Sequence, residues 1–194
     1  MKKILISILA VVSLMTSCNV AQQAVGAYNM TKCEYSYQSM GNLTLSGINL
    51  NQPNLSAINI LKLTSILTGT ATSIPLNMTL NVNVKNPNTS AALLNGLQYI
   101  VSIDDIEFTN GRLDQPINVP GGATSVLPVT IGVDLATLIK NNSKEAVFKI
   151  AKNLAGISGD LSKITLQLKP TFLIGNTPIT SPVYYPVSFS FGGK

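Results

Sequence analysis

The chain has 194 residues, which suits one domain with a sizeable core, and it carries a formal net charge of +5 with no histidine. The absence of histidine excludes Ser-His-Asp and Cys-His catalysis and removes the commonest metal ligand. Only 11% of the residues are charged, and the basic ones are scattered, with Arg112 as the only arginine. We therefore expect no nucleic-acid partner. Polarity comes mainly from Asn, Ser and Thr, which favour exposed strand faces and turns.

The first residues have the features of a bacterial lipoprotein signal peptide. Lys2 and Lys3 precede an apolar run from Ile4 to Leu14, and small residues stand just before Cys18. The run is shorter than the roughly 20 residues of a membrane-spanning helix. An ordinary secretory cleavage site is the alternative interpretation. We expect residues 1–17 to be the signal peptide and Cys18 to carry lipid. Cys18 would then anchor the protein in the bacterial cell envelope.

The residue after Cys18 bears on which membrane is involved. Asn19 is not the aspartate that resembles an inner-membrane retention signal, so the outer membrane is predicted. Residues 18–33 are predicted to be a lipidated tether, because Asn19 to Lys32 is polar and lacks periodicity. If Cys18 is lipidated, Cys33 has no intramolecular partner and no histidine to activate it. We expect Cys33 to be an inert, partly buried thiol.

Residues 34–194 are predicted to form a single domain. Alternating stretches within Glu34 to Leu50, such as residues 43–48, indicate a strand. Helical spacing over Leu55 to Leu67 predicts a short helix on the N-terminal side of the domain, capped by Asn54 or Ser56 and ended by Gly69.

The clearest strand is Ile74 to Lys85. Five apolar residues alternate with five polar ones, which predicts one dry and one wet face: Leu76, Met78, Leu80, Val82 and Val84 against Asn77, Thr79, Asn81, Asn83 and Lys85. A turn at Asn86-Pro87-Asn88 follows, because proline cannot donate to a sheet.

Further strands are predicted over Leu97 to Ile103 and Thr124 to Val133. A hairpin turn is expected at Asp104-Asp105, a second turn at Thr109-Asn110-Gly111, and an extended segment from Pro116 to Gly122. The carboxylates of this region are the candidates for a calcium site: Asp104, Asp105, Glu107 and Asp114. Strand alternation separates Asp104 from Asp105 and Glu107, so solvated carboxylates are predicted and no metal site.

The principal helical region begins at Asp134. A stripe at helical spacing, interrupted near residues 141–143, continues to Leu154, with lysines on the opposite face. A basic amphipathic helix can lie on a membrane, but a helix packed on a sheet is the prediction. Alternation from Ile164 to Lys169 and from Tyr185 to Phe191 indicates two last strands. The fold class is therefore mainly β, an antiparallel β-sandwich with one principal helix.

The order of these features resembles the water-stress and hypersensitive-response domain of the group 2 late embryogenesis abundant proteins. The alternating strand ending in Asn86-Pro87-Asn88 is followed by Tyr99, the Asp104-Asp105 hairpin, Gly111 and Asp134-Leu135. The resemblance covers about residues 74–191. It implies a fibronectin type III-like sandwich and a non-enzymatic, stress-linked role, and it brings no catalytic residues.

These observations predict a non-enzymatic envelope lipoprotein with a structural or stress-protective role. No catalytic residue, cofactor or metal is expected, and Cys18 is the only candidate site residue. The alternative is a binding module for an apolar ligand or another envelope protein. An enzyme is the third class, which loss of turnover on substituting one carboxylate would support.

Overall fold

The computed structural model describes residues 19–51, 55–68 and 71–192. Among these residues the fold is mainly β, and every strand pairing is antiparallel, which confirms the broad fold class. One sheet has the order β2-β1-β3-β8. Its strands are β1 (Glu34–Leu45), β2 (Ile48–Asn49), β3 (Pro75–Lys85) and β8 (Thr124–Asp134).

A second sheet has the order β10-β9-β5-β6, and β11 also pairs with β9. Its strands are β5 (Gly96–Ile103), β6 (Ile106–Leu113), β9 (Leu161–Ile174), β10 (Thr177–Thr180) and β11 (Tyr185–Gly192). A small third sheet joins β4 (Ala92–Leu94) to β7 (Ile117–Val119).

The two large sheets meet along both edges, because β1 lies near β11 and β6 lies near β8. The core between them comes from alternate residues, as the sequence pattern predicted. On β3, Leu76, Met78, Leu80, Val82 and Val84 are buried as predicted. Thr79 was predicted on the wet face but is also buried, and its hydroxyl oxygen accepts a hydrogen bond from Asn42 Nδ2. Alternate residues of β5 and β9, including Val101 and Leu166, are also buried. The two-residue period of a strand therefore fixes the register of both sheets.

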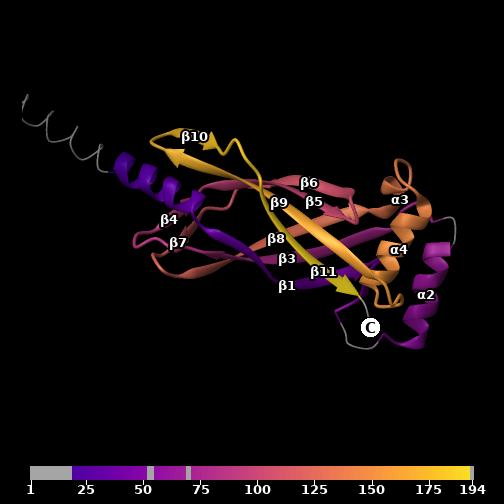
Figure 1. Cartoon of the computed structure of the whole chain (residues 1–194). Coiled ribbons are helices and arrows are strands. Elements are labelled where there is room, and N and C mark those ends of the chain that lie inside the picture. The colour runs from indigo at the N-terminus through magenta and orange to yellow at the C-terminus, as the bar shows by residue number, and fades with distance from the viewer. Residues whose placement is uncertain (1–18, 52–54, 69–70, 193–194) are drawn as a thin grey trace, which may run out of the picture.

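Three helices lie at one end of the molecule (Figure 1): α2 (Ala57–Thr68), α3 (Leu135–Leu138) and α4 (Lys144–Leu154). The predicted cap Ser56 accepts a hydrogen bond from the backbone N–H of Asn59 at the start of α2, while Asn54 and Gly69 lie outside the described residues. The apolar stripe of α4 is buried and the helix contacts β9 and β11. The prediction of a helix packed on a sheet is confirmed.

A fourth helix, called here the leading helix (residues 19–31), corrects the expectation of an irregular tether. It lies at the opposite end of the molecule from α2 (Figure 1). Gly26, Ala27, Asn29 and Met30 are buried against the domain. No apolar periodicity marked this segment, because half of its buried face is glycine and asparagine. Among the described helices, none combines the length and hydropathy needed to cross a membrane.

Two local predictions also need correction, one of a strand and one of a turn. The strand expected to run through residues 43–48 is broken by a turn, where Ser46 and Gly47 both have positive φ. Conversely, Thr109-Asn110-Gly111 is no turn but part of β6, where Gly111 is the register partner of Tyr99. The short strands β4 and β10 were not predicted, since three or four residues give too little alternation to detect.

Candidate functional site

The four candidate carboxylates serve separate structural roles. Asp104 and Asp105 form the predicted two-residue hairpin turn between β5 and β6, with φ values of 47° and 64°. The Asp104 carboxylate accepts hydrogen bonds from Ser162 Oγ and the Lys163 backbone N–H, both at 2.8 Å. It therefore ties the hairpin to β9.

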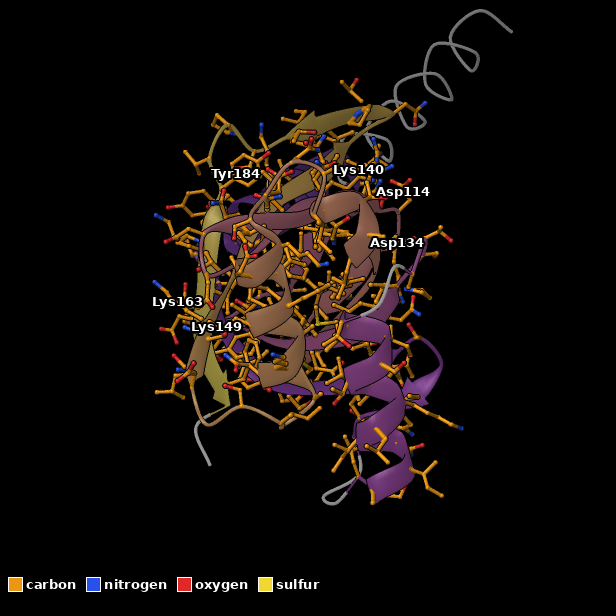
Figure 2. The ribbon with its side chains drawn as sticks, turned by 90° about the vertical axis from the view of Figure 1, so that its right-hand side faces the viewer. Asp114, Asp134, Lys140, Lys149, Lys163 and Tyr184 are labelled. Atoms are coloured by element: carbon orange, nitrogen blue, oxygen red, sulfur yellow. The ribbon has the colours of Figure 1, made fainter. Side chains whose placement is uncertain are left out.

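The remaining acidic side chains are engaged elsewhere. Glu107 accepts a hydrogen bond from Asn110 Nδ2, and Asp114 pairs with Arg112. Asp114 and Lys163 lie on opposite sides of the molecule in Figure 2. Asp104 is hydrogen-bonded to the Lys163 backbone, so it is far from Asp114. Within the described ranges, no three acidic or cysteine side chains gather closely enough to hold a metal ion.

The Asn86-Pro87-Asn88 turn is held by a buried amide. The Asn86 side chain is fully buried. Its Nδ2 donates to the carbonyl oxygens of Ser90 and Val119, each at 2.9 Å. Its Oδ1 accepts from the Asn88 backbone N–H at 3.0 Å. This motif therefore stabilises a turn and leaves no free group for chemistry.

The same turn binds the leading helix. Asn29 Nδ2 donates to Ser90 Oγ at 2.8 Å and to the Ala91 carbonyl at 3.0 Å. Asn88 Nδ2 donates to the Asn29 carbonyl at 3.2 Å. Farther along the helix, Gln23 Oε1 accepts from the backbone N–H of Gly175, in the turn between β9 and β10. The helix is thus fixed to the domain at two points, Gln23 and Asn29.

Tyr99 and Gly111, two residues of the predicted family pattern, face each other across β5 and β6. A Cβ atom on Gly111 would lie 2.6 Å from Tyr99 Oη, so a larger residue there would displace the ring. The hydroxyl donates to the Thr130 carbonyl on β8 at 3.3 Å. This pair joins the two large sheets.

Of the two cysteines, only Cys33 lies within the described residues. Cys18 lies outside the described residues, so its lipidation stays a prediction. Cys33 is 7% exposed, and burial raises the pKa of its thiol to about 11. At neutral pH the group is therefore a thiol rather than the reactive thiolate.

The basal pocket is a small hollow between the leading helix and the domain, about 260 Å³ in volume. Gln23 and Ala27 of the leading helix line one side, and Leu93, Ile117 and Phe172 line the other. No sequence pattern predicted this pocket, because its walls come from four separate segments.

The distal groove is a larger hollow of about 660 Å³ at the opposite end of the molecule. Figure 2 looks onto this end, where α2 and α4 lie. Its lining is uncharged. Its apolar side chains come from β1, from α2 and the residues just before it, and from the end of α4 and the residues after it, including Met40, Leu43, Leu55, Ile60, Leu154 and Ile157.

A series of side-chain hydrogen bonds begins at Asn153 in the wall of this groove. Asn153 Nδ2 donates to Ser162 Oγ at 2.7 Å, and Ser162 donates to Asp104. The Asn153 Oδ1 atom is buried and has no hydrogen-bond partner among the described residues. Buried acceptors are nearly always paired, so this unpaired oxygen makes Asn153 the polar residue of the lining that stands out. No sequence pattern pointed to it.

The helix α2 leaves much of its apolar surface in contact with solvent beside the groove. Ile58 is 65% exposed and Leu61 is 70% exposed, while only Leu63 and Leu67 are buried. Large exposed apolar patches on soluble domains mark sites that bind proteins, membranes or ligands. The basal pocket and the distal groove are therefore the two candidate binding sites.

Comparison with known proteins identifies one family. The family model described as late embryogenesis abundant protein matches residues 81–186, which is more than half of the chain. The segment containing α2 precedes this match. No curated protein matches the sequence.

Solved structures show distant likenesses. A crystal structure of a protein from Archaeoglobus fulgidus is 14% identical, with a TM-score of 0.40, and the match covers 81% of this chain and 98% of that one. A solution structure from Arabidopsis thaliana is 11% identical, with a TM-score of 0.44, covering 64% and 74%. A third, named as a late embryogenesis abundant protein, is 16% identical, with a TM-score of 0.41, covering 98% and 89%.

Proposed function

The chain belongs to the late embryogenesis abundant protein family, and from this membership we propose that it is a non-enzymatic, stress-protective lipoprotein of the bacterial envelope. The family match carries the stress-protective part of the proposal, and the signal-peptide pattern before Cys18 carries the envelope part. We further propose that the two large sheets form a fibronectin type III-like sandwich. The residues that stood out in the sequence support a role without turnover, because Asp104, Asn86 and Tyr99 each hold the fold together.

The location proposed is the outer membrane, with the lipid on Cys18 as the anchor. Two or more acyl chains hold a protein on a bilayer far better than one. The position of the leading helix is consistent with this arrangement, since it would connect the anchor directly to the domain. The membrane is then the first partner, and an envelope protein or a lipid is the second.

Substitution of Cys18 tests the anchor. Cys18→Ala should remain an uncleaved precursor, because processing requires the thiol that receives the lipid. Immunoblotting distinguishes precursor from mature protein, and separation of the two membranes locates the intact form. Normal maturation and membrane retention of Cys18→Ala would refute the anchor.

Deletion of the gene tests the role. Survival after desiccation or envelope stress should fall, while growth without stress and every metabolic step are retained. A normal stress response with loss of one hydrolytic or transfer activity would place the protein among the enzymes instead.

A binding module for an apolar ligand or an envelope protein is the second candidate function. The exposed apolar surface of α2 beside the uncharged distal groove favours it. Lipid that copurifies with the protein, and that is lost on Ile60→Asp in the lining of the groove, would support this function over a purely structural one.

A further inference from the structure

Gln23 and Ala27 of the leading helix line the basal pocket, and this helix lies at the end of the molecule where the described chain begins (Figure 1). Its volume of about 260 Å³ exceeds that of a cavity of about 150 Å³, lined by aliphatic and aromatic side chains, that stays dry and binds benzene. Leu93, Ile117 and Phe172 supply comparable walls here. The pocket therefore suits a hydrocarbon chain in both size and polarity.

The polarity of the lining distinguishes between possible occupants. No lining residue carries a charge, so an ionised headgroup would find no counter-ion. Its polar side chains are the amides of Gln23, Asn95 and Asn118, and the Gln23 side-chain oxygen already accepts a hydrogen bond from the Gly175 backbone at 2.6 Å. A peptide segment would bring backbone N–H and C=O groups that each need a partner, whereas an acyl chain brings none.

We infer that one acyl chain of the lipid on Cys18 occupies the basal pocket. This inference rests on the lipidation of Cys18 in the proposed function. The described helix begins at Asn19 and reaches Gln23 within about 6 Å at the helical rise per residue, so an acyl chain attached next to Asn19 begins near the pocket. Covalent attachment gives such a chain an effective concentration in the millimolar range. Free lipid therefore competes poorly with it.

The surroundings of the protein set how often the pocket is filled. A chain that moves from a bilayer to the pocket exchanges one apolar environment for another, so the free-energy change is small. A chain that would otherwise meet water gains the full benefit of burial. The pocket is therefore filled most when the lipoprotein is outside a bilayer, and it shields one chain there.

Photocrosslinking of the intact lipoprotein tests this inference. Cells are grown with a diazirine-bearing fatty acid, and the mature protein is purified, diluted below the critical micelle concentration of its detergent and irradiated. Mass spectrometry should find acyl adducts on peptides that carry Leu93, Ile117 or Phe172, and several-fold fewer on peptides of the distal groove. Absence of adducts from these three peptides under such conditions, where the acyl chain has no other apolar environment, would overturn the inference.

The mass of the N-terminal peptide separates the two possible failures. An unlipidated Cys18 would refute both the anchor and the inference. A lipidated Cys18 without adducts in the pocket would refute the inference alone and leave the anchor intact.

A pair of variants on one helix gives the matched control. Ala27 is buried and lines the pocket, whereas Ala24 is exposed on the same helix. Ala27→Phe should reduce adducts in the pocket several-fold, and Ala24→Phe should leave them unchanged. Equal adduct yields in the two folded variants would contradict the assignment. If Ala27→Phe does not fold, the adduct map of the unaltered protein still decides.

Discussion

Asn86 shows at the level of one residue why a polar motif can be structural. Its carboxamide is fully buried and donates to two carbonyl oxygens while accepting from Asn88. A buried amide in this setting is stabilising because both its donor and acceptor sides are satisfied.

Replacing the donor side of this amide should be costly. Asn86→Asp places an oxygen against the carbonyl oxygens of Ser90 and Val119, so attraction becomes repulsion. We expect the free energy of unfolding to fall by about 3 kcal/mol, the upper range for an unpaired buried polar group. Urea denaturation measures the change.

Asn81→Asp is the control for that substitution. The Asn81 amide is only half-buried and donates to Ser39 Oγ on the wet face of β3. Its effect should stay below about 1 kcal/mol. Equal losses in the two variants would show that burial of Asn86 is not what stabilises the turn.

The register of β3 makes a second residue-level prediction. Val82 is 1% exposed, and the next residue, Asn83, is half-buried on the opposite face. Val82→Asp should cost several kcal/mol, roughly 3 to 5, because it buries an unpaired charge. Asn83→Asp should stay within about 0.5 kcal/mol. Similar thermal midpoints for the two variants would contradict the register.

At the level of elements, Asp134 connects a strand to a helix. It ends β8, and its carboxylate accepts from Ser73 Oγ, the Ile74 backbone N–H and the Ala136 backbone N–H. The hydrogen bond from Ser73, followed by that from Ile74, lowers the pKa of Asp134 below its ordinary value. The residue therefore caps α3 and holds the start of β3 at the same time.

This cap predicts a pH dependence. Asp134→Ala should lower the free energy of unfolding by about 1 kcal/mol at neutral pH, the usual value of an N-cap. Because the folded pKa lies below the ordinary value of about 3.9, the contribution is present above that pH. It is lost as the pH falls through the folded pKa.

Denaturation midpoints across this range provide the measurement. The difference between the unaltered protein and Asp134→Ala should shrink below about pH 4. Asp105→Asn, at the exposed hairpin, is the control and should change stability little at any pH, since asparagine also tolerates its backbone conformation. A difference that grows on acidification would contradict the role of Asp134.

Elements with a strong local pattern were predictable from the sequence, and elements without one were not. The strand at residues 74–85 and the start of the helical region at Asp134 were predicted because one local rule decides each of them, and Ser56 was one of the two predicted caps of α2. The leading helix was missed because Asn29 and Gly26 make its contacts. Gly111 suggested a turn locally, but its real role depends on Tyr99, a residue twelve positions away on another strand.

The candidate sites were less predictable than the strands. The basal pocket joins the leading helix to Leu93, Ile117 and Phe172, and no local pattern brings these segments together. The exposed face of α2 did have a signal, since several apolar residues share that helix with Lys62 as its one charge. Helical spacing alone does not say which of those apolar residues a neighbour will cover.

The whole molecule has two ends with different character (Figure 1). At one end, the leading helix is fixed by Asn29 and Gln23 and points toward the expected lipid anchor. At the other end, α2 leaves Ile58 and Leu61 exposed beside the distal groove. The family match begins after α2. The domain would therefore present α2 away from the membrane that anchors it.

The central claim is that this domain protects the cell from stress while it is held at the membrane. Survival after drying tests it most directly, in a deletion strain that carries the intact gene, Asn83→Asp, Val82→Asp or Cys18→Ala. We predict that the intact gene and Asn83→Asp restore survival, because both give a folded and anchored domain. Val82→Asp and Cys18→Ala should not restore it. Full survival of the uncomplemented deletion strain would contradict the account.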